Sequence, residues 1–183
     1  MKVRTLRAGG ALLALSALTI VATGGGASAD TATKRAAATI TMEKNGRQLF
    51  FEGPRTVAEG AKLKVENLTN PNRVGPHTFS LTKRNALPEG NRDFRRCGSF
   101  ELKVCANIVQ AHRFDPATGE VNKPVVGGKT WNRLFSNRKK GDSWYTEKKG
   151  NKDTRTVTAD AGTKLFYFCV VHPDMQGKIK VTE

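Results

Sequence analysis

The sequence of 183 residues contains 31 Lys and Arg residues against 16 Asp and Glu residues, which gives a formal net charge of +15. This length suits one domain, or one domain with a sizeable insertion, and a hydrophobic content of 38% excludes a fully disordered chain. Because no apolar run reaches the roughly 18 residues that a membrane span requires, we expect no transmembrane segment in the mature chain.

The N-terminal segment has the layout of a secretory signal peptide. Three basic residues within the first seven positions precede an apolar run at 11–23, and the small residues Ala27-Ser28-Ala29 follow a glycine triplet. This pattern predicts a signal peptide at 1–29, with cleavage before Asp30. The mature chain would then carry 28 basic and 16 acidic residues, a net charge of +12, and would work in the periplasm, at the cell surface or outside the cell, where disulfides persist.

Beyond a polar, flexible lead-in at 30–35, the chain shows the period of two that is typical of β-strands. Ile40 and Met42 alternate with polar residues, and Asn45-Gly46 is a strong hairpin turn before the next apolar stretch. Further strands are predicted around 62–66, from 77 to 81, from 163 to 169 and at the C-terminus, around 178–181. Short strands between Gly, Asn and Pro turns predict an all-β fold, an antiparallel or mixed sandwich at 36–183.

The stretch at about 84–140 differs from the strands on both sides of it. It is rich in Gly, Asn, Pro and Arg and has no long period of either kind, although 101–112 is compatible with a short helix. It contains 12 basic and 5 acidic residues and so carries +7 of the net charge. We therefore predict a basic insertion, rich in loops and partly helical, within the β-rich domain.

The residues that carry chemistry lie near the C-terminus and at one upstream strand. Cys169, His172 and Met175 lie within seven residues between two predicted strands, and His77 begins an earlier strand. Two imidazoles, one thiolate and one weak axial thioether are the ligand set of a blue-copper electron-transfer site. The soft sulfur ligands suit Cu(I), and imidazole suits both oxidation states. Zinc would bind several of the same atoms, but a structural zinc site has no use for a thioether.

Two sequence segments resemble the cupredoxin family of type 1 blue copper proteins, with plastocyanin-like and amicyanin-like features. They are Phe166-Tyr167-Phe168-Cys169-Val170-Val171-His172-Pro173-Asp174-Met175 and Val74-Gly75-Pro76-His77-Thr78-Phe79. The resemblance covers about residues 36–83 and 141–183 and implies a Greek-key β-sandwich that binds one copper ion through His77, Cys169, His172 and Met175.

The same resemblance assigns roles to residues around these four. Many family members have Asn after the first histidine, where it ties the two ligand segments together; this chain has Thr78, whose hydroxyl is expected to make a similar bond. By the same likeness, His172 would lie at the surface on an apolar patch that includes Val170, Val171 and Pro173.

Two cysteines and one histidine remain outside this ligand set. In an oxidising compartment, Cys97 and Cys105 are expected to form a disulfide that staples the insertion. The alternative is a second metal site formed by Cys97, Cys105 and His112. This is disfavoured, because adding one third ligand to two cysteines seldom completes a metal site. His112 is also the only histidine left to build a catalytic copper centre, so we do not expect an enzyme.

Three functions stay open at this point. The favoured one is a copper protein that carries single electrons between extracytoplasmic redox partners, with the basic insertion attracting an acidic partner protein. The alternative is copper binding and handling without a redox circuit, although the mature chain lacks Met-rich or His-rich tracts. The charge of +12 also permits attachment to an anionic cell-surface polymer, whereas export and the lack of a reading motif argue against nucleic acid. Asn67-Leu68-Thr69 matches a glycosylation acceptor, to which we assign no role.

Overall fold

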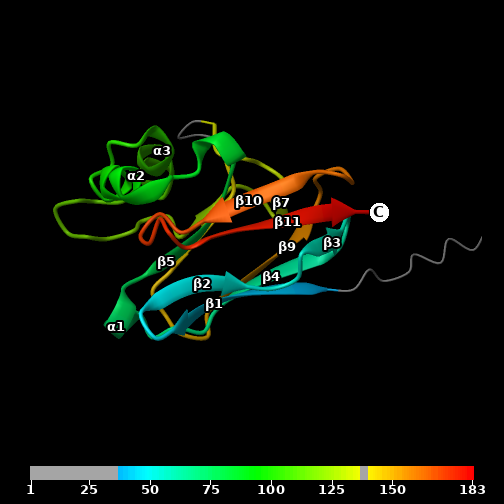
Figure 1. Ribbon diagram of the computed structural model, residues 1–183, viewed down its shortest axis with the longest axis horizontal. Helices are drawn as coiled ribbons and strands as arrows, with labels where there is room; N and C mark the ends of the chain where they lie inside the picture. The colour runs from blue at the N-terminus through cyan, green and yellow to red at the C-terminus, as the bar shows by residue number, and fades with distance from the viewer. Residues whose placement is uncertain (1–36, 137–139) are drawn as a thin grey trace, which may run out of the picture. The chain divides into compact units, whose positions relative to one another are not determined.

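The computed structural model describes residues 37–136 and 140–183. Two β-sheets, of five and six strands, face each other in this part of the chain (Figure 1). The first sheet has the order β2-β1-β4-β9-β7 and consists of β1 (Ala38–Asn45), β2 (Gln48–Glu52), β4 (Lys62–Asn67), β7 (Thr130–Trp131) and β9 (Lys152–Val157). The second has the order β3-β11-β10-β5-β8-β6 and consists of β3 (Thr56–Ala58), β5 (His77–Thr82), β6 (Val125–Val126), β8 (Ser143–Thr146), β10 (Lys164–Phe168) and β11 (Gln176–Thr182).

The strand pairing is mixed, as the sequence predicts. Strand β1 pairs parallel with β4, β3 pairs parallel with β11, and β7 pairs parallel with β9, while the other pairs are antiparallel. The hairpin predicted at Asn45-Gly46 is confirmed, with Asn45 opposite Gln48. Gly46 has a φ of 57°, a left-handed conformation that glycine adopts without a steric penalty.

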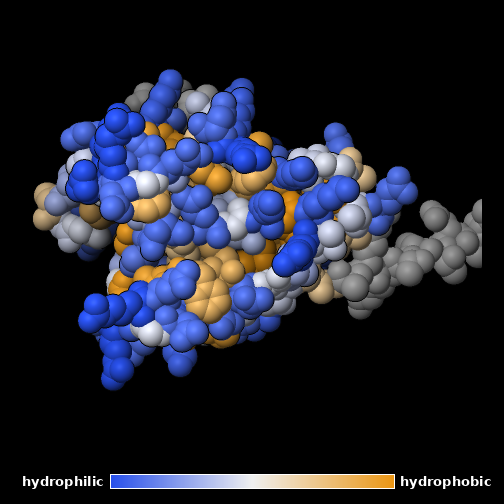
Figure 2. Space-filling model, in the orientation of Figure 1, coloured by the Kyte–Doolittle hydropathy of each residue, from blue (hydrophilic) through white to orange (hydrophobic). Residues whose placement is uncertain are grey.

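The space between the sheets is filled by the apolar residues that alternate along the predicted strands. Phe79 lies at the centre of this core, with its ring centroid 4.6 Å from that of Tyr167 and 5.1 Å from that of Trp131. Ile40 and Met42 of β1 are fully buried in the same core. Figure 2 shows hydrophilic residues over most of one face of the molecule and a band of hydrophobic residues between the β1–β2 hairpin and β11.

The described part of the predicted insertion is folded and packs on the outer face of the six-stranded sheet. It contains a 3-10 turn (Arg84–Ala86), α2 (Gly90–Gly98), α3 (Lys103–Ala111) and the short strands β6 and β7. Helix α3 confirms the helix expected at 101–112, whereas α2 was not predicted. Figure 1 shows the two helices side by side at one end of the sandwich. Ile108 of α3 belongs to a second buried cluster with Phe168 of β10 and Val170, so β10 and the residues that follow it are covered on both faces.

A four-residue helix, α1 (Pro71–Val74), leads into β5 at the same end of the sandwich as the loop between β10 and β11 (Figure 1). Among the described residues, no helix has the length and apolar character needed to cross a bilayer. The predicted signal peptide at 1–29 and lead-in at 30–35 lie outside the described residues.

Candidate metal centre

The sheet register brings the predicted ligand segments together. Strand β5 begins at His77 and pairs antiparallel with β10, with Ser80 opposite Phe168. Cys169 follows β10 directly, so its side chain reaches the start of β5. The loop from Cys169 to Met175 then turns back into β11, which pairs antiparallel with β10.

Three donor atoms converge at this point. His77 Nδ1 lies 3.9 Å from Cys169 Sγ, and His172 Nδ1 lies 3.6 Å from the same sulfur. All three donors lie within 4.8 Å of one another. With metal–nitrogen and metal–sulfur bonds of about 2.0 and 2.3 Å at a tetrahedral angle, the two donors would be about 3.5 Å apart. The cluster therefore has the dimensions that one bound metal ion requires.

Hydrogen bonds fix which nitrogen of His77 faces this cluster. Thr69 Oγ1 donates to Asn67 Oδ1 at 2.7 Å and also lies 2.8 Å from His77 Nε2. The hydroxyl of Thr69 donates its only hydrogen to Asn67, so it can only accept a hydrogen bond from His77 Nε2. Nδ1 is then bare and directed at Cys169, the arrangement in which a second partner orients a metal-binding histidine.

The orientation of the His172 ring is fixed in the same way, by a hydrogen bond at Nε2. Its Nε2 lies 2.7 Å from the carbonyl oxygen of Val74, the last residue of α1. A carbonyl only accepts, so Nε2 carries the hydrogen and Nδ1 is bare. Both imidazoles thus offer a free Nδ1 to one point next to the sulfur.

Burial keeps both imidazoles in the neutral form that binds metals. The pKa of His77 is lowered to about 4, first by burial and then by the neighbouring His172. Burial also lowers the pKa of His172, against the opposing effects of the Val74 carbonyl and Asp174. The same desolvation raises the pKa of the fully buried Cys169 thiol. A cation placed among these groups would stabilise the thiolate and release its proton.

The backbone around Cys169 is tied to β5 and to its own loop. The amide of Thr78 donates to Cys169 Sγ at 3.3 Å, and the amide of Val170 donates to Thr78 Oγ1 at 2.8 Å. The amide of Cys169 donates to the carbonyl of Met175 at 3.0 Å, which closes the loop. Thr78 thus ties the two ligand segments together, in the manner that the family resemblance implies for the residue after the first histidine.

Met175 lies beside Cys169 in the main core cluster and is fully buried. Its amide donates to the carbonyl of His172 at 2.9 Å, so the predicted ligand residues of the loop belong to one hydrogen-bonded turn. The methionine that the sequence predicts as the fourth ligand is therefore held in the same loop as Cys169 and His172.

The remaining two cysteines and His112 lie in the insertion and are not part of the donor cluster. Cys97 and Cys105 form a disulfide that joins α2 to α3, and Cys169 is the free cysteine. The alternative second metal site is wrong, because both sulfurs are bonded to each other and His112 has other partners. His112 Nδ1 lies 2.7 Å from the carbonyl of Lys123, and Nε2 lies 2.7 Å from the hydroxyl of Ser143.

The expected apolar patch around His172 is found in part. Val171 is 41% exposed, whereas Val170 is 7% exposed and packs under the insertion. Pro173 and the ring of His172 are half-buried. The insertion therefore covers one side of the ligand loop and leaves the side around Val171 open.

The residues that orient the two histidines were not predicted from the sequence. Asn67 and Thr69 are buried beside His77, although their spacing matched only a glycosylation acceptor. A buried position at the end of a predicted strand and the nearby histidine were the available signals for them. Val74 gave none, because it acts through its backbone carbonyl.

The described part of the chain thus places a His₂Cys cluster, with a buried methionine in the adjoining core, at one end of a two-sheet β-sandwich. These are the residue types that a type 1 copper site uses. No family model and no curated protein sequence matches this chain.

Among solved structures, the chain is similar to three auracyanins, of which auracyanin A is described as a "blue" copper protein. Dithionite-reduced auracyanin from the photosynthetic bacterium Roseiflexus castenholzii is 16% identical, with a TM-score of 0.41 over 80% of this chain and 97% of that one. Auracyanin A from Chloroflexus aurantiacus is 19% identical, with a TM-score of 0.42 over 80% of this chain and 100% of that one. Auracyanin B is 14% identical, with a TM-score of 0.42 over 81% of this chain and 91% of that one.

Proposed function

We propose that this protein is an exported electron carrier, and not an enzyme, that binds one copper ion through His77, Cys169, His172 and Met175. The observation that carries the proposal is the convergence of two bare Nδ1 atoms on one buried sulfur, each ring being fixed by a hydrogen bond at its other nitrogen. Copper bound there supplies a one-electron Cu(I)/Cu(II) couple.

The residues of the chain contribute rigidity and exclusion of water. His77, Cys169 and Met175 are fully buried, and the first two are anchored to different strands of one sheet. Thr69 Oγ1 and the Val74 carbonyl accept hydrogen bonds from the two imidazoles, and the Thr78 amide donates one to the sulfur. These bonds keep the three donors oriented before metal arrives. Such preorganisation lets the ligands stay in position while the charge of the metal changes, which is what an electron carrier needs.

The half-buried ring of His172 and the exposed Val171 mark the side through which electrons would pass to a partner. A mature chain with 28 basic and 16 acidic residues would attract an acidic redox protein and would also allow attachment to an anionic cell-surface polymer. The disulfide supports function in an oxidising compartment outside the cytoplasm.

The test of the ligand set is to add Cu(II) to the purified protein and to record its optical and EPR spectra. We expect intense thiolate-to-copper absorption and reversible one-electron reduction, both absent from Cys169→Ser. Met175→Leu should shift the spectrum and the reduction potential. Met42→Leu is its matched control, because Met42 is equally buried in the same core.

Two results would contradict the proposal. Failure of the protein to bind Cu(II) with thiolate absorption would refute the copper site. Normal spectra combined with slow electron self-exchange, and rapid loss of copper to a competing chelator, would instead favour copper handling over electron transfer.

Small redox reagents test separately whether the positive charge of the protein acts near the copper site. Oxidation of the Cu(I) protein by an anionic complex should slow as salt is added, whereas oxidation by a cationic complex should become faster. Equal salt dependence for both reagents would show that the positive charge does not act near the copper site.

A further inference from the structure

We propose that His112, which lies in the insertion, is a positioning residue for the metal centre and tunes its reduction potential through a buried chain of hydroxyl groups. This inference rests on the proposed copper site and deepens it. It assigns to the insertion a role in the redox chemistry itself, in addition to any effect of its charge on partners.

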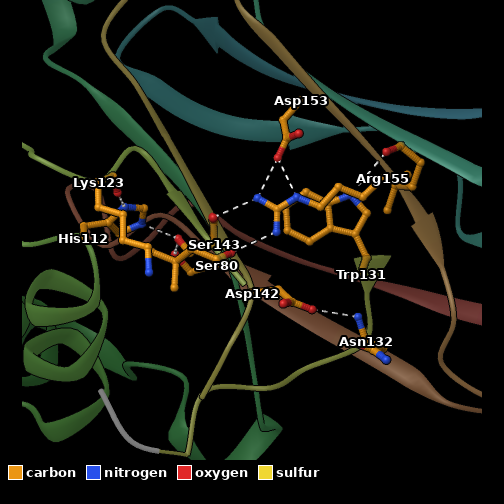
Figure 3. A network of polar contacts seen from close by, with 11 residues as sticks. Ser80, His112, Lys123, Trp131, Asn132, Asp142, Ser143, Asp153 and Arg155 are labelled. Atoms are coloured by element: carbon orange, nitrogen blue, oxygen red, sulfur yellow. Dashed lines mark hydrogen bonds and ion pairs between the residues drawn. The ribbon is translucent and has the colours of Figure 1, made fainter. Parts of the chain in front are cut away.

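The chain of contacts runs from His112 to Thr78, and Figure 3 shows its first members, His112, Ser143 and Ser80. His112 Nε2 lies 2.7 Å from Ser143 Oγ, and Ser143 Oγ lies 2.7 Å from Ser80 Oγ. Ser80 Oγ lies within hydrogen-bond distance of Thr78 Oγ1, at 3.2 Å. His112 is 2% exposed, Thr78 is 1% exposed, and both serines are fully buried. Water therefore has little access to compete for these hydrogen bonds.

Thr78 connects this chain to the sulfur. Its hydroxyl accepts from the amide of Val170 at 2.8 Å, and a hydrogen bond from the Thr78 side chain opposes the rise in the pKa of the Cys169 thiol that burial causes. Its amide donates to Cys169 Sγ at 3.3 Å. Hydrogen bonds that Thr78 Oγ1 accepts make its hydroxyl a stronger donor to the Cys169 sulfur.

The direction of the hydrogen bonds follows from a count of hydrogens. The carbonyl of Lys123, 2.7 Å from Nδ1, only accepts, so Nδ1 carries a hydrogen. Burial and the nearby Arg155 favour the neutral imidazole, which leaves Nε2 as an acceptor. Ser143 must then donate to His112. Since its single hydrogen is used there, Ser80 donates to Ser143 at 2.7 Å in preference to Thr78 at 3.2 Å.

His112 therefore draws hydroxyl hydrogens away from the metal centre. If residue 112 accepts no hydrogen bond, Ser143 turns to Ser80 and Ser80 turns fully to Thr78. A hydroxyl that accepts a stronger hydrogen bond becomes a stronger donor, so Thr78 would then bind the Cys169 sulfur more tightly. Hydrogen bonding to this sulfur tunes the potential of a type 1 site, and withdrawal of its electron density favours the reduced metal.

The experiment compares copper-loaded proteins by voltammetry and optical spectroscopy. We expect His112→Phe to raise the reduction potential and to shift the thiolate-to-copper absorption. The electron-transfer equilibrium constant should change by up to about tenfold, or 59 mV for one electron. His112→Gln, whose side-chain carbonyl can accept from Ser143, should restore both readouts. Ser143→Ala also releases the hydrogen of Ser80 to Thr78 and should raise the potential in the same direction.

A double-mutant cycle isolates the pathway, because His112→Phe should have no effect on the potential in a Thr78→Val background. The inference is wrong if His112→Phe lowers the melting temperature and leaves the potential and spectrum unchanged, since His112 would then be only structural. If that variant fails to fold, the potential of Ser143→Ala decides. Wild-type protein that binds no copper would refute the proposed function itself, whereas copper binding with no response in these variants would refute only this inference.

Discussion

At the scale of single residues, the candidate site depends on small polar side chains that hold the ligands. The candidate ligands were predictable, because Cys169, His172 and Met175 have a characteristic spacing and His77 begins a strand, and the fold brings His77, Cys169 and His172 together. Thr69 was not, since threonine is common at the ends of strands and no spacing links it to His77. Its role arises only when the end of β4 is folded back against the start of β5.

We expect Thr69→Val to weaken copper binding by about 10- to 100-fold, the usual effect of losing an outer partner of a metal-binding histidine. Valine has nearly the same shape as threonine but leaves His77 Nε2 without its acceptor at 2.8 Å. Competition with a chelator of known affinity measures the change. Thr69→Ser is the control, because it keeps the hydroxyl and should bind copper almost as the wild type does. Equal affinity in the valine variant would show that burial alone orients the ring.

At the scale of elements, the strands with regular apolar alternation were predicted and the polar ones were not. Strand β9 was missed because its two buried positions are Arg155 and Val157, and an arginine in a sequence predicts an exposed position. Helix α2 was missed because it contains glycine and four charged residues and buries only Cys97. Both elements depend on long-range partners, a cation–π and ion-pair site for Arg155 and a disulfide for Cys97, which local sequence patterns do not reveal.

Arg155 joins the two sheets near the insertion, as Figure 3 shows. Its guanidinium lies 3.8 Å from the ring centroid of Trp131, pairs with Asp153 at 2.7 Å, and donates to the carbonyls of Val126 and Ser143 at 2.9 and 3.0 Å. We expect Arg155→Leu to reduce the free energy of unfolding by about 3 kcal/mol, because it leaves the partly buried Asp153 carboxylate and two carbonyls without their partner.

Chemical denaturation of the metal-free protein measures this loss. Arg96→Leu on α2 is the control, since its side chain is 46% exposed and its ion pairs lie at the surface; it should change the free energy of unfolding by no more than about 0.5 kcal/mol. Similar effects of the two substitutions would contradict the role given to Arg155.

The disulfide acts on the insertion and not on the ligands. Cys97 and Cys105 are eight residues apart, and closing so short a loop in the unfolded chain should contribute about 2.5 kcal/mol to the free energy of unfolding. The double variant Cys97→Ala and Cys105→Ala should therefore unfold more easily and still bind copper with thiolate absorption. Loss of that absorption would mean that the insertion must be stapled for the copper site to form.

At the scale of the whole molecule, the insertion supplies a second core and makes the sandwich thicker at its metal-binding end. Its charge was predictable from composition, but its packing was not. Phe168 and Val170 were the available signal, because they point away from the first core and nevertheless are apolar. The insertion also buries His112, which adds a titratable group to the interior near the site and makes the stability of the whole fold sensitive to pH.

We therefore expect the metal-free protein to lose stability as the pH falls from about 7 to about 4. The pKa values of His77 and His112 are both lowered from 6.5 to about 4, mainly by burial. Between these values the unfolded chain takes up protons that the folded protein does not, so the free energy of unfolding rises with pH in this window. Each histidine contributes about 3 kcal/mol when the full shift is counted.

Urea denaturation at a series of pH values measures the slope, and His112→Gln should reduce it by up to one proton. A free energy of unfolding that stays constant from pH 7 to pH 4 would mean that both imidazoles take up protons in the folded protein as they do in the unfolded chain. That result would contradict the lowered pKa values and the buried, neutral rings.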